Sequence, residues 1–365
     1  MDNDNPLVSI CIPVFNHGAY IRRALESSIH QTYKNIEIVV VDNASTDNTR
    51  EVVSEYVRRD NRVKYFRNET NIGGGRNFLK CAELASGYFM EALGSDDWLS
   101  KNYIEEGVKN FLANLNIASV FAGDLTFSFL GVGAMDFVGE AEVEPGEYPA
   151  DWFFSHFYRH PSIAGRGFHS FMRRNDFIGA LKKTLNNPIN LFQRGEIKEP
   201  FDTPVFLNVL AGYDSFLVIK TSAYIKTVHG KDHVGLQGKS FGSPVGQVRY
   251  ATALRLAYES FFDDHRFKKY FRQLRFFGGL SMESNAILFF LSGRFKKSDN
   301  KEYSEALKNY FNGYSKNEKY LIIICTIPYM IFRIAVRFGK LFARKQSFTP
   351  SRNHFLTEDF TFKAD

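Results

Sequence analysis

The chain has 365 residues, of which 16% are aromatic, and its 46 Lys and Arg against 40 Asp and Glu leave a net charge of +6. That length suffices for one large α/β domain and a smaller unit, and the composition is typical of a folded protein rather than a low-complexity chain. The net charge is modest, and we expect no nucleic-acid partner. Three scattered cysteines provide neither a disulfide framework nor paired metal ligands.

Strand and helix patterns alternate along the first third of the chain. Continuous apolar runs predict strands at residues 7–14, 36–41, 63–66, 88–93 and 117–121. Apolar residues at helical spacing predict helices at 18–30, around 52–57, at 78–84 and at 101–113. Buried strands joined through helices by short connections indicate an open parallel sheet, whose ligand site lies beyond the carboxyl ends of the strands.

The pattern is less regular in the second part of the chain. The segment from about 131 to 195 is rich in glycine, aromatic residues and histidine. A helix is predicted at 205–210 and a strand at 216–219, and from residue 247 onward the pattern is helical and basic. This part therefore gives a weaker basis for predicting the fold.

An apolar run near the C-terminus, Leu321–Phe332, is shorter than the ~20 residues that span a bilayer, and Pro328 interrupts it. Basic and apolar residues alternate over Arg333–Lys345, as in a helix that lies on an anionic membrane surface. An ordinary buried C-terminal helix is the alternative. Because Met1–Asn5 show no signal segment, we expect a cytoplasmic protein that is peripheral on the inner face of the cell membrane through residues 320–345.

Two adjacent carboxylates, Asp96 and Asp97, follow the strand predicted at 88–93. Burying such a pair at a strand end is costly unless a cation or a hydrogen-bond donor meets it. Neighbouring residues of an extended backbone point in opposite directions, so both side chains cannot easily hold one ion. We therefore expect one carboxylate on a metal ion and the other on a ribose hydroxyl or an orienting partner. A solvated helix cap is the alternative.

Further polar groups stand at or near strand ends. Asp42 ends the second strand, where its carboxylate would accept the N–H of a pyrimidine base or cap the next helix. Phe15 and Asn16 follow the first strand and either flank a base or form a turn. Gly73–Gly75 let the backbone approach a ligand, and Arg76 would neutralise phosphate or contact a base.

Two histidine pairs have a spacing of four residues, which suits metal binding on a helix. They are His156 with His160 and His229 with His233. Neither pair carries the His-Glu signature of a metalloprotease. We interpret them as packing or substrate-contacting residues, and their role stays open.

Four segments together resemble the inverting family 2 glycosyltransferases, and they occur in the family's order and spacing in the N-terminal part of the chain. They are Pro13–Asn16, Val41–Asp47, Asn71–Gly73 with Arg76-Asn77, and Gly94–Trp98. The resemblance implies the GT-A fold, which is a Rossmann-like, open and mostly parallel α/β sheet flanked by helices, here followed by a helical C-terminal region. The resemblance weakens through the middle of the chain and is slight in the C-terminal third.

The family assigns roles to matching residues of this chain. The resemblance implies that Asp42 reads the base, that Asp96 faces the ribose, and that the nucleotide is bound by Pro13, Phe15, Asn16, Asp42, Asn43, Arg76 and Asp96. It implies that Asp97 holds a divalent metal ion, Mn²⁺ or Mg²⁺. The sequence departs from the family at two places, because Asn43 and Ser95 stand where many relatives have Asp.

The general base of the family lies just before a helix of the acceptor half. The segment Phe201–Leu207 resembles that site, so we expect Asp202 to be the base, with Glu199, Glu196 and Asp214 as alternatives. The base would take the proton of the acceptor hydroxyl as that hydroxyl attacks the sugar from the face opposite the leaving group. It is therefore natural that the base and the metal-binding carboxylate come from separate parts of the chain.

The resemblance implies a metal-dependent inverting glycosyltransferase. It would move a sugar from a nucleotide-diphosphate donor, such as a UDP-sugar, to a hydroxyl of a glycan or lipid-linked saccharide in bacterial polysaccharide biosynthesis. A sugar-1-phosphate nucleotidyltransferase is disfavoured, because such enzymes usually open with a Gly-rich loop and this chain has Pro13–Gly18 there. A non-catalytic sugar- or membrane-binding protein of the same fold is the other alternative.

The chain is expected to divide by function. A GT-A domain is predicted at 1–245, with a nucleotide-binding half at 1–115 and an acceptor half at 116–245. A helical, basic and membrane-associated region is predicted at 246–345, and a tail at 346–365.

Overall fold

The computed structural model describes residues 5–122, 125–129, 144–156, 168–186, 202–219, 224–228 and 299–329, and the single residues 248, 252, 272, 275, 276, 279 and 331. Two compact units make up the chain, Met1–Leu274 and Arg275–Asp365. The functional division at residue 245 stays a prediction.

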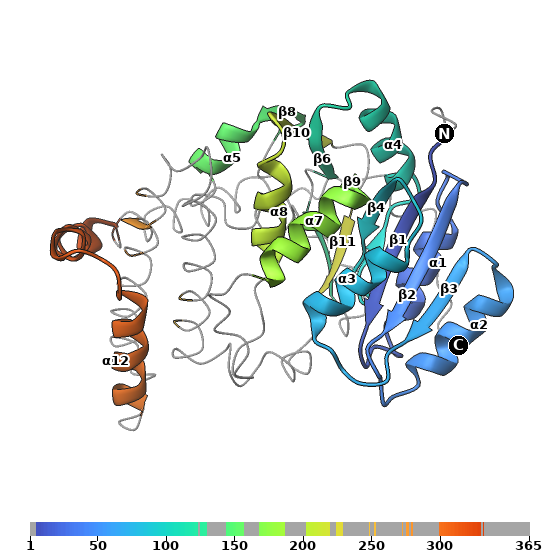
Figure 1. Ribbon diagram of the computed structural model, residues 1–365, viewed down its shortest axis with the longest axis horizontal. Helices are drawn as coiled ribbons and strands as arrows, with labels where there is room; N and C mark the ends of the chain where they lie inside the picture. The colour runs from blue at the N-terminus through green and yellow to red at the C-terminus, as the bar shows by residue number, and fades with distance from the viewer. Residues whose placement is uncertain are drawn as a thin grey trace, which may run out of the picture. The chain divides into compact units, whose positions relative to one another are not determined.

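A large sheet forms the centre of the first unit, with the strand order β3-β2-β1-β4-β9-β6-β10-β8 (Figure 1). The strands are β1 (Val8–Val14), β2 (Ile36–Asp42), β3 (Val63–Arg67), β4 (Phe89–Ala92), β6 (Ile117–Ala122), β8 (Gly146–Pro149), β9 (Phe171–Arg173) and β10 (Ser215–Ile219). Only β9 and β8 among them run antiparallel to their neighbours. The open, mostly parallel sheet expected for the GT-A fold is confirmed.

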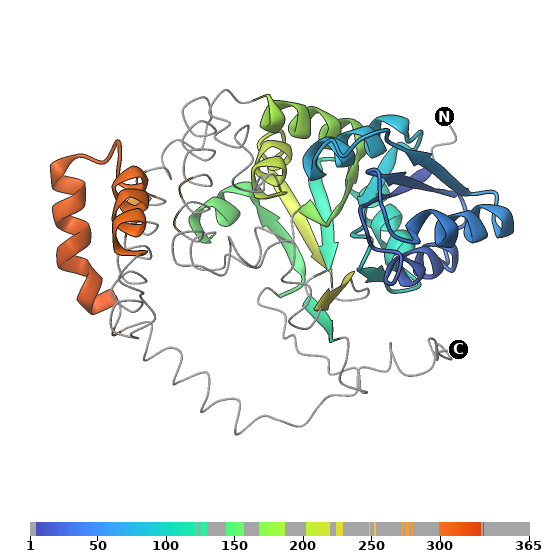
Figure 2. The ribbon, with the colours of Figure 1, turned by 90° about the horizontal axis from the view of Figure 1, so that it is seen from below.

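Helices cover both faces of this sheet (Figures 1 and 2). One face packs against α1 (Ile21–Ile29), α2 (Thr49–Arg59) and α4 (Tyr103–Ala113). The other packs against α3 (Gly74–Leu84), α5 (Ala150–His156), α7 (Arg174–Leu185) and α8 (Asp202–Leu210). Because β1 and β2 are buried on both faces, successive residues of each strand enter opposite cores, which explains their continuous apolar runs.

Two predicted helices begin earlier than their apolar patterns indicate. The helix predicted at 78–84 starts at Gly74, because Gly73 before it takes a left-handed φ of 86° that turns the chain into the helix. The helix predicted at 205–210 starts at Asp202, and Pro204 fits in its first turn, where a missing N–H leaves no helical hydrogen bond unmade. In both helices a polar first turn comes before the apolar pattern, so the pattern predicts a start that is too late.

A second, three-stranded sheet joins distant parts of the chain. It consists of β5 (Trp98–Leu99), β11 (Tyr224–Val228) and β7 (Leu125–Phe129), in the order β5-β11-β7. Strand β11 pairs antiparallel with β5 and parallel with β7. Because β5 directly follows Asp97, this sheet brings β11 to the carboxylate pair.

The second unit is helical where the structure describes it, as expected for the C-terminal region. It contains α12 (Asp299–Tyr310) and a helix over residues 316–329. Its core includes Phe311, Tyr314 and Ile322, all at most 9% exposed. Within the described residues, no helix combines the length and apolar character needed to cross a membrane.

One carboxyl group lies inside the core of the first unit. Glu91 in β4 is fully buried, and neither of its oxygens has a hydrogen-bond partner within the described residues. Burial raises the pKa of Glu91 to about 8, an effect that the neighbouring Tyr103 hydroxyl reduces only in part. Glu91 therefore holds a proton at neutral pH.

The buried Glu91 should make the stability of the protein depend on pH. Its pKa is 4.5 without perturbation and about 8 in the folded protein, so the free energy of unfolding falls as the pH rises through that interval. Glu91→Gln keeps the size and shape of the side chain and removes its titratable carboxyl group. In urea unfolding, we expect the free energy of unfolding of this variant to exceed that of the wild type by about 4 kcal/mol at pH 8 and by only about 1 kcal/mol at pH 5.

The exposed Glu69 offers a control, because Glu69→Gln makes the same chemical change on the surface. Its stability should follow the wild type at both pH values. Equal stabilities of Glu91→Gln and the wild type at pH 8 would contradict a protonated Glu91.

Candidate functional site

Strands β1, β2 and β4 run in the same direction and therefore end at the same edge of the main sheet. The segments that follow them are 15–18, 43–48 and 93–97. Hydrogen bonds between these segments gather at one place the polar residues that the sequence singled out. This edge is the candidate functional site.

The segments after β1 and β2 are locked together by their own polar groups. Asn16 and Ala44 both have left-handed backbone angles, with φ of 54° and 64°. The Asn16 N–H donates to Ser45 Oγ at 2.9 Å, and the Thr46 N–H donates to Asn16 Oδ1 at 2.7 Å. Asn16 therefore forms a turn, which is one of the two roles that the sequence left open.

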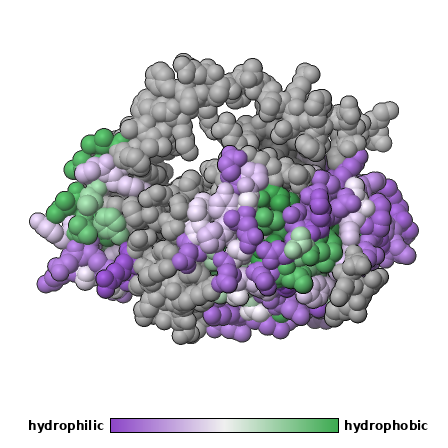
Figure 3. Space-filling view, turned by 90° about the horizontal axis from the view of Figure 1, so that it is seen from above, coloured by the Kyte–Doolittle hydropathy of each residue, from purple (hydrophilic) through white to green (hydrophobic). Residues whose placement is uncertain are grey.

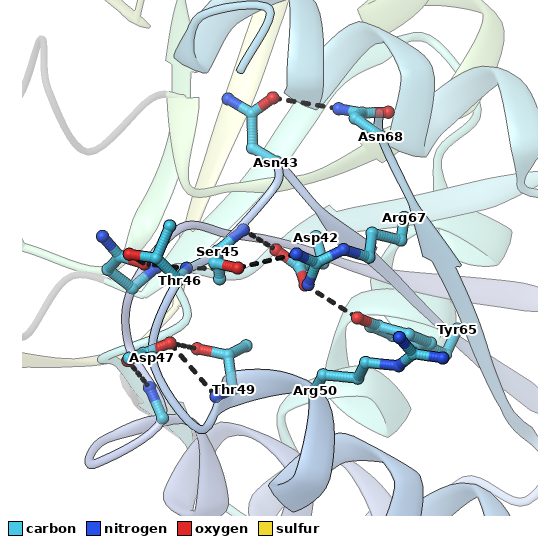
Figure 4. Close-up of polar contacts among 12 residues, drawn as sticks. Asp42, Asn43, Ser45, Thr46, Asp47, Thr49, Arg50, Tyr65, Arg67 and Asn68 are labelled. Atoms are coloured by element: carbon cyan, nitrogen blue, oxygen red, sulfur yellow. Dashed lines mark hydrogen bonds and ion pairs between the residues drawn. The ribbon is translucent and has the colours of Figure 1, made fainter. Parts of the chain in front are cut away.

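Asp42, at the end of β2, is fully buried and carries three hydrogen bonds (Figure 4). Its Oδ1 accepts from the Ser45 N–H at 2.8 Å. Its Oδ2 accepts from the Tyr65 hydroxyl at 2.7 Å and from Arg67 Nη1 at 2.6 Å. Burial, followed by the hydrogen bond to Asp42, raises the pKa of Tyr65 to about 12, so this hydroxyl keeps its proton.

These contacts give Asp42 a structural role that the sequence did not indicate. Arg67 neutralises the carboxylate and also donates from Nη2 to the Ser45 carbonyl at 2.7 Å, which ties β3 to the segment after β2. A carboxylate accepts about four hydrogen bonds, so at most one acceptor position of Asp42 remains for a base. Base reading by Asp42 stays a prediction.

Asn43, which follows Asp42, is used within the protein rather than presented to a ligand. Its Oδ1 accepts from Asn68 Nδ2 and from the Ile72 N–H, both at 2.9 Å, and its Nδ2 donates to Asn71 Oδ1 at 2.8 Å. The side chain is 3% exposed. The network fixes the loop before α3, and Arg76 lies exposed in the first turn of that helix.

The carboxylate loop, Gly94–Asp97, gives its two acidic residues different surroundings. Asp97 is 3% exposed, and its Oδ2 accepts from the Tyr224 hydroxyl at 2.8 Å. Its Oδ1 accepts from the Thr227 N–H, also at 2.8 Å. Asp96 is half-buried. The contacts of Asp97 therefore argue against the division of roles implied by the resemblance, since the more accessible carboxylate is that of Asp96.

The carboxylate loop is also tied to the segment after β1. The imidazole Nδ1 of His17 lies 2.7 Å from Ser95 Oγ. Gly94 makes the compact loop possible, because a Cβ atom added there would lie 2.6 Å from Asp97 Oδ2 and 3.2 Å from Asp96 Oδ1. The loop therefore requires glycine for its close packing on the two carboxylates.

The candidates for the general base lie at different edges of the main sheet. Asp202 is the first residue of α8, and α8 returns to β10 through residues 211–214. The start of α8 therefore lies toward the edge at which β10 ends, which is the edge of the candidate site. Asp214 directly precedes β10 at the opposite edge, where its carbonyl accepts from the Ala150 N–H. Asp214 therefore lies away from the edge that carries the carboxylate loop, and its role as an alternative base stays a prediction.

Several predicted residues lie outside the described part of the chain. They are Glu196, Glu199, His160, His229 and His233. For His156 and Asp202 the structure describes the backbone alone. Within the described residues, no three His, Cys, Asp or Glu side chains cluster as metal ligands.

The residues that the sequence interpretation missed are the partners of the carboxylates. Arg67 ends β3 directly opposite Asp42 in the parallel register, one residue beyond the strand predicted at 63–66. An arginine just after an apolar strand was a usable signal, although only for a known register. Tyr224 and Thr227 gave no such signal, because more than a hundred residues separate them from Asp97.

The Arg67–Asp42 pair should matter more for stability than an exposed ion pair does. Arg67→Met leaves the buried Asp42 without its positive partner, so we expect the free energy of unfolding to fall by more than the loss of an exposed ion pair costs. Arg22→Met is a matched control, because Arg22 and Glu55 are both largely exposed, and it should cost below about 1 kcal/mol. Equal losses in chemical denaturation at pH 7 would contradict a structural role of Arg67 as the partner of the buried Asp42.

Comparison with known proteins identifies the N-terminal part of the chain. Residues 9–137 match the family described as Glycosyl transferase family 2. A putative glycosyltransferase EpsH of Bacillus subtilis is 39% identical over 104 residues, which are 28% of this chain and 30% of that protein. Hyaluronan synthase of Pasteurella multocida is 34% identical over 119 residues, which are 33% of this chain and 12% of that protein. The chain spans less than half the length of the curated relatives it matches first.

Solved structures extend the likeness of the fold over most of the chain. TarS 1–349 of S. aureus in complex with UDP has a TM-score of 0.56 and 18% identity, and covers 90% of this chain and 87% of that one. Its complex with UDP-GlcNAc has a TM-score of 0.57 and 17% identity, over 86% and 83% of the two chains. At this identity the likeness concerns the fold alone. Together with the family match, it shows that residues 9–137 are a family 2 glycosyltransferase domain within a GT-A fold.

Proposed function

We propose that the chain is an inverting glycosyltransferase that moves a sugar from a nucleotide-diphosphate donor to a hydroxyl acceptor. The observation that carries the proposal is that the carboxylate loop, the segments after β1 and β2, and the start of α8 share one edge of the main sheet. The family 2 domain supports the reaction class. The TarS complexes with UDP and UDP-GlcNAc, which share the fold, support a UDP-sugar as donor.

The donor nucleotide would lie across the ends of β1 and β2. Pro13, Phe15 and Asn16 are half-buried there, so Phe15 can offer a ring face to a base. Arg76 is exposed at the first turn of α3, where its guanidinium would pair with phosphate oxygens. Asp42 retains one acceptor position for a base N–H. These surroundings support a nucleotide site at this edge.

A divalent ion, Mn²⁺ or Mg²⁺, fits the chemistry of the carboxylate loop through Asp96. Asp97 is 3% exposed and is held by hydrogen bonds from β11, whereas Asp96 is half-buried, so Asp96 is the more accessible candidate ligand. Such ions are commonly held by one or two protein carboxylates together with substrate phosphates. When bound, the ion would supply positive charge beside the diphosphate leaving group.

Asp202 would act as the general base at the start of α8. Its carboxylate would take the proton from the acceptor hydroxyl while that oxygen forms a bond to the anomeric carbon. The bond from the anomeric carbon to the β-phosphate oxygen breaks on the opposite face, and the diphosphate leaves with the bonding electrons. A single displacement of this kind inverts the anomeric configuration.

The role of Asp202 can be tested by separating transfer from donor binding. Asp202→Asn should bind UDP as the wild type does, and should lose transfer by about 10²–10⁴-fold, as expected on removal of a general base. Asp214→Asn is the control, because Asp214 lies at the other edge of the sheet. Near-normal transfer by Asp202→Asn would contradict the assignment. Wild-type UDP binding with neither transfer nor hydrolysis of any donor would favour the non-catalytic alternative.

The acceptor is proposed to be a glycan or lipid-linked saccharide at a membrane. Relatives named hyaluronan synthase and chondroitin synthase support a polysaccharide product. The second unit exposes an apolar helix face between residues 320 and 331, shown in green at the left of Figure 3. Its side chains are 51–69% exposed, and they are Tyr320, Leu321, Ile323, Ile324, Ile327 and Ile331.

The charge next to this face favours an anionic lipid surface. Residues 333–345 carry five Lys or Arg, and no Asp or Glu occurs between residues 320 and 345. Two copies of such a segment repel each other, whereas acidic lipid attracts it. Ile322 and Thr326 on the same helix are buried, so the exposed side chains form one face of a packed helix. We therefore place the protein at the inner face of the cell membrane.

Membrane docking predicts a loss of vesicle binding when the exposed face becomes polar. The double variant Ile323→Ser, Ile327→Ser should co-sediment with anionic liposomes at least about tenfold more weakly, because each buried isoleucine stabilises by about 2 kcal/mol. Val57→Ser, an exposed apolar site in the first unit, should change nothing. High salt should release the wild type only in part, because salt screens charge and leaves apolar burial intact. Unchanged binding by the double variant would contradict docking through this face.

A further inference from the structure

The carboxylate loop is fastened on both sides of Asp96. On one side, Ser95 Oγ lies 2.7 Å from His17 Nδ1. On the other side, Asp97 is bonded to β11 through Tyr224 and Thr227. Asp96 therefore stands between two anchored neighbours, and the direction of its carboxylate depends on them.

On the β11 side, the Tyr224 hydroxyl lies at the centre of the hydrogen bonds that hold the carboxylate loop. It lies 2.8 Å from Asp97 Oδ2, 3.1 Å from the Gly94 nitrogen and 3.0 Å from His169 Nδ1. The tyrosine is 6% exposed. Burial and the nearby Asp97 charge raise the pKa of Tyr224 well above its ordinary value, so the hydroxyl keeps its proton. One oxygen thus joins both ends of the carboxylate loop.

The donors and acceptors around this hydroxyl are fixed by chemistry. The Asp97 carboxylate can only accept, so the Tyr224 proton points to it. The Tyr224 oxygen then accepts from the Gly94 N–H. His169 Nδ1 also lies 2.9 Å from the Ala92 carbonyl, which can only accept, so Nδ1 carries a proton. That N–H is shared between the Ala92 carbonyl and the Tyr224 oxygen.

We propose that Tyr224 and His169 are positioning residues that set the carboxylate loop for donor binding, with Asp97 as the anchor of the loop rather than a ligand of the ion. The inference rests on the proposed function, because the loop matters only if Asp96 meets the ion and diphosphate. His169 lies just before β9, contacts the Ala92 carbonyl at the end of β4 and orients Tyr224, and Tyr224 holds Asp97 and Gly94 together. A carboxylate held in place in this way needs little reorganisation when the charged ligand arrives.

The first test compares UDP affinity with and without Mn²⁺ by calorimetry. Asp96→Asn should abolish the gain in UDP affinity that Mn²⁺ gives the wild type. Tyr224→Phe should reduce that gain about tenfold, as expected on loss of a hydrogen bond to a charged group, while metal-free UDP affinity changes less than about twofold. Tyr103→Phe is the control, because the Tyr103 ring is also buried and its centroid lies 6.5 Å from that of the Tyr224 ring. An unchanged Mn²⁺ gain in Tyr224→Phe would overturn the proposal.

The second test asks which nitrogen of His169 acts. Asparagine can place an N–H where Nδ1 stands, and glutamine can place an amide where Nε2 stands. If His169 orients Tyr224 through Nδ1, His169→Asn should keep the Mn²⁺ gain within about threefold and His169→Gln should lose it to the extent seen in Tyr224→Phe. The reverse order would mean that His169 acts through Nε2 on another group, and would overturn its positioning role.

A spectroscopic test separates this proposal from the proposed function. Trp98 directly follows Asp97 and is 4% exposed, and in a Trp152→Phe background it is the sole tryptophan. Tyr224→Phe should make Trp98 fluorescence more accessible to acrylamide, and His169→Asn should not. If Mn²⁺ does not change the UDP affinity of the wild type, the proposed ion is wrong. The hydrogen bonds that hold the carboxylate loop are still tested by the quenching of Trp98 fluorescence. Unchanged acrylamide quenching in Tyr224→Phe would then overturn the proposal that Tyr224 holds the carboxylate loop.

Discussion

The structure depends on how a parallel sheet accommodates buried carboxylates. Each of them must lose its charge or find a donor, because an uncompensated ion in the core costs several kcal/mol. Glu91 keeps its proton. Asp42 is paired with Arg67, and Glu37 with Lys64. Asp97 accepts hydrogen bonds from a hydroxyl and a backbone N–H.

These solutions also organise the edge at which the family 2 domain is expected to bind its donor. The Asp42 contacts join β2, β3 and the segment after β2, and the Asp97 contacts join the carboxylate loop to β11. The polar groups that make the strand ends rigid are therefore the same groups that the sequence marks as functional. A donor site built in this way takes its precision from the folded scaffold. The residues proposed to meet the donor, such as Phe15, Asp96 and Arg76, are the half-buried and exposed ones at this edge.

Much of the main sheet was predictable from the sequence because it is buried on both faces. Strands β1 and β2 are continuous apolar runs, and the polar residues Asn16, just after β1, and Asp42, at the end of β2, located the candidate site. The short strands β8, β9 and β11 were not predicted, because they contain three to five residues and mix polar with apolar groups. Such strands form through pairing with distant partners, which a local pattern does not reveal.

The roles of Asp96 and Asp97 show the same limit at the level of single residues. The alternation of an extended backbone indicated one ligand-facing carboxylate and one on an orienting partner, and Tyr224 is such a partner for Asp97. Which of the two residues faces inward depends on β11, which lies far away in the sequence. Gly94 completes the arrangement, since a side chain at this position would collide with the Asp97 carboxylate. The loop can thus place the buried Asp97 next to the more exposed Asp96 because its first residue leaves room for both carboxylates.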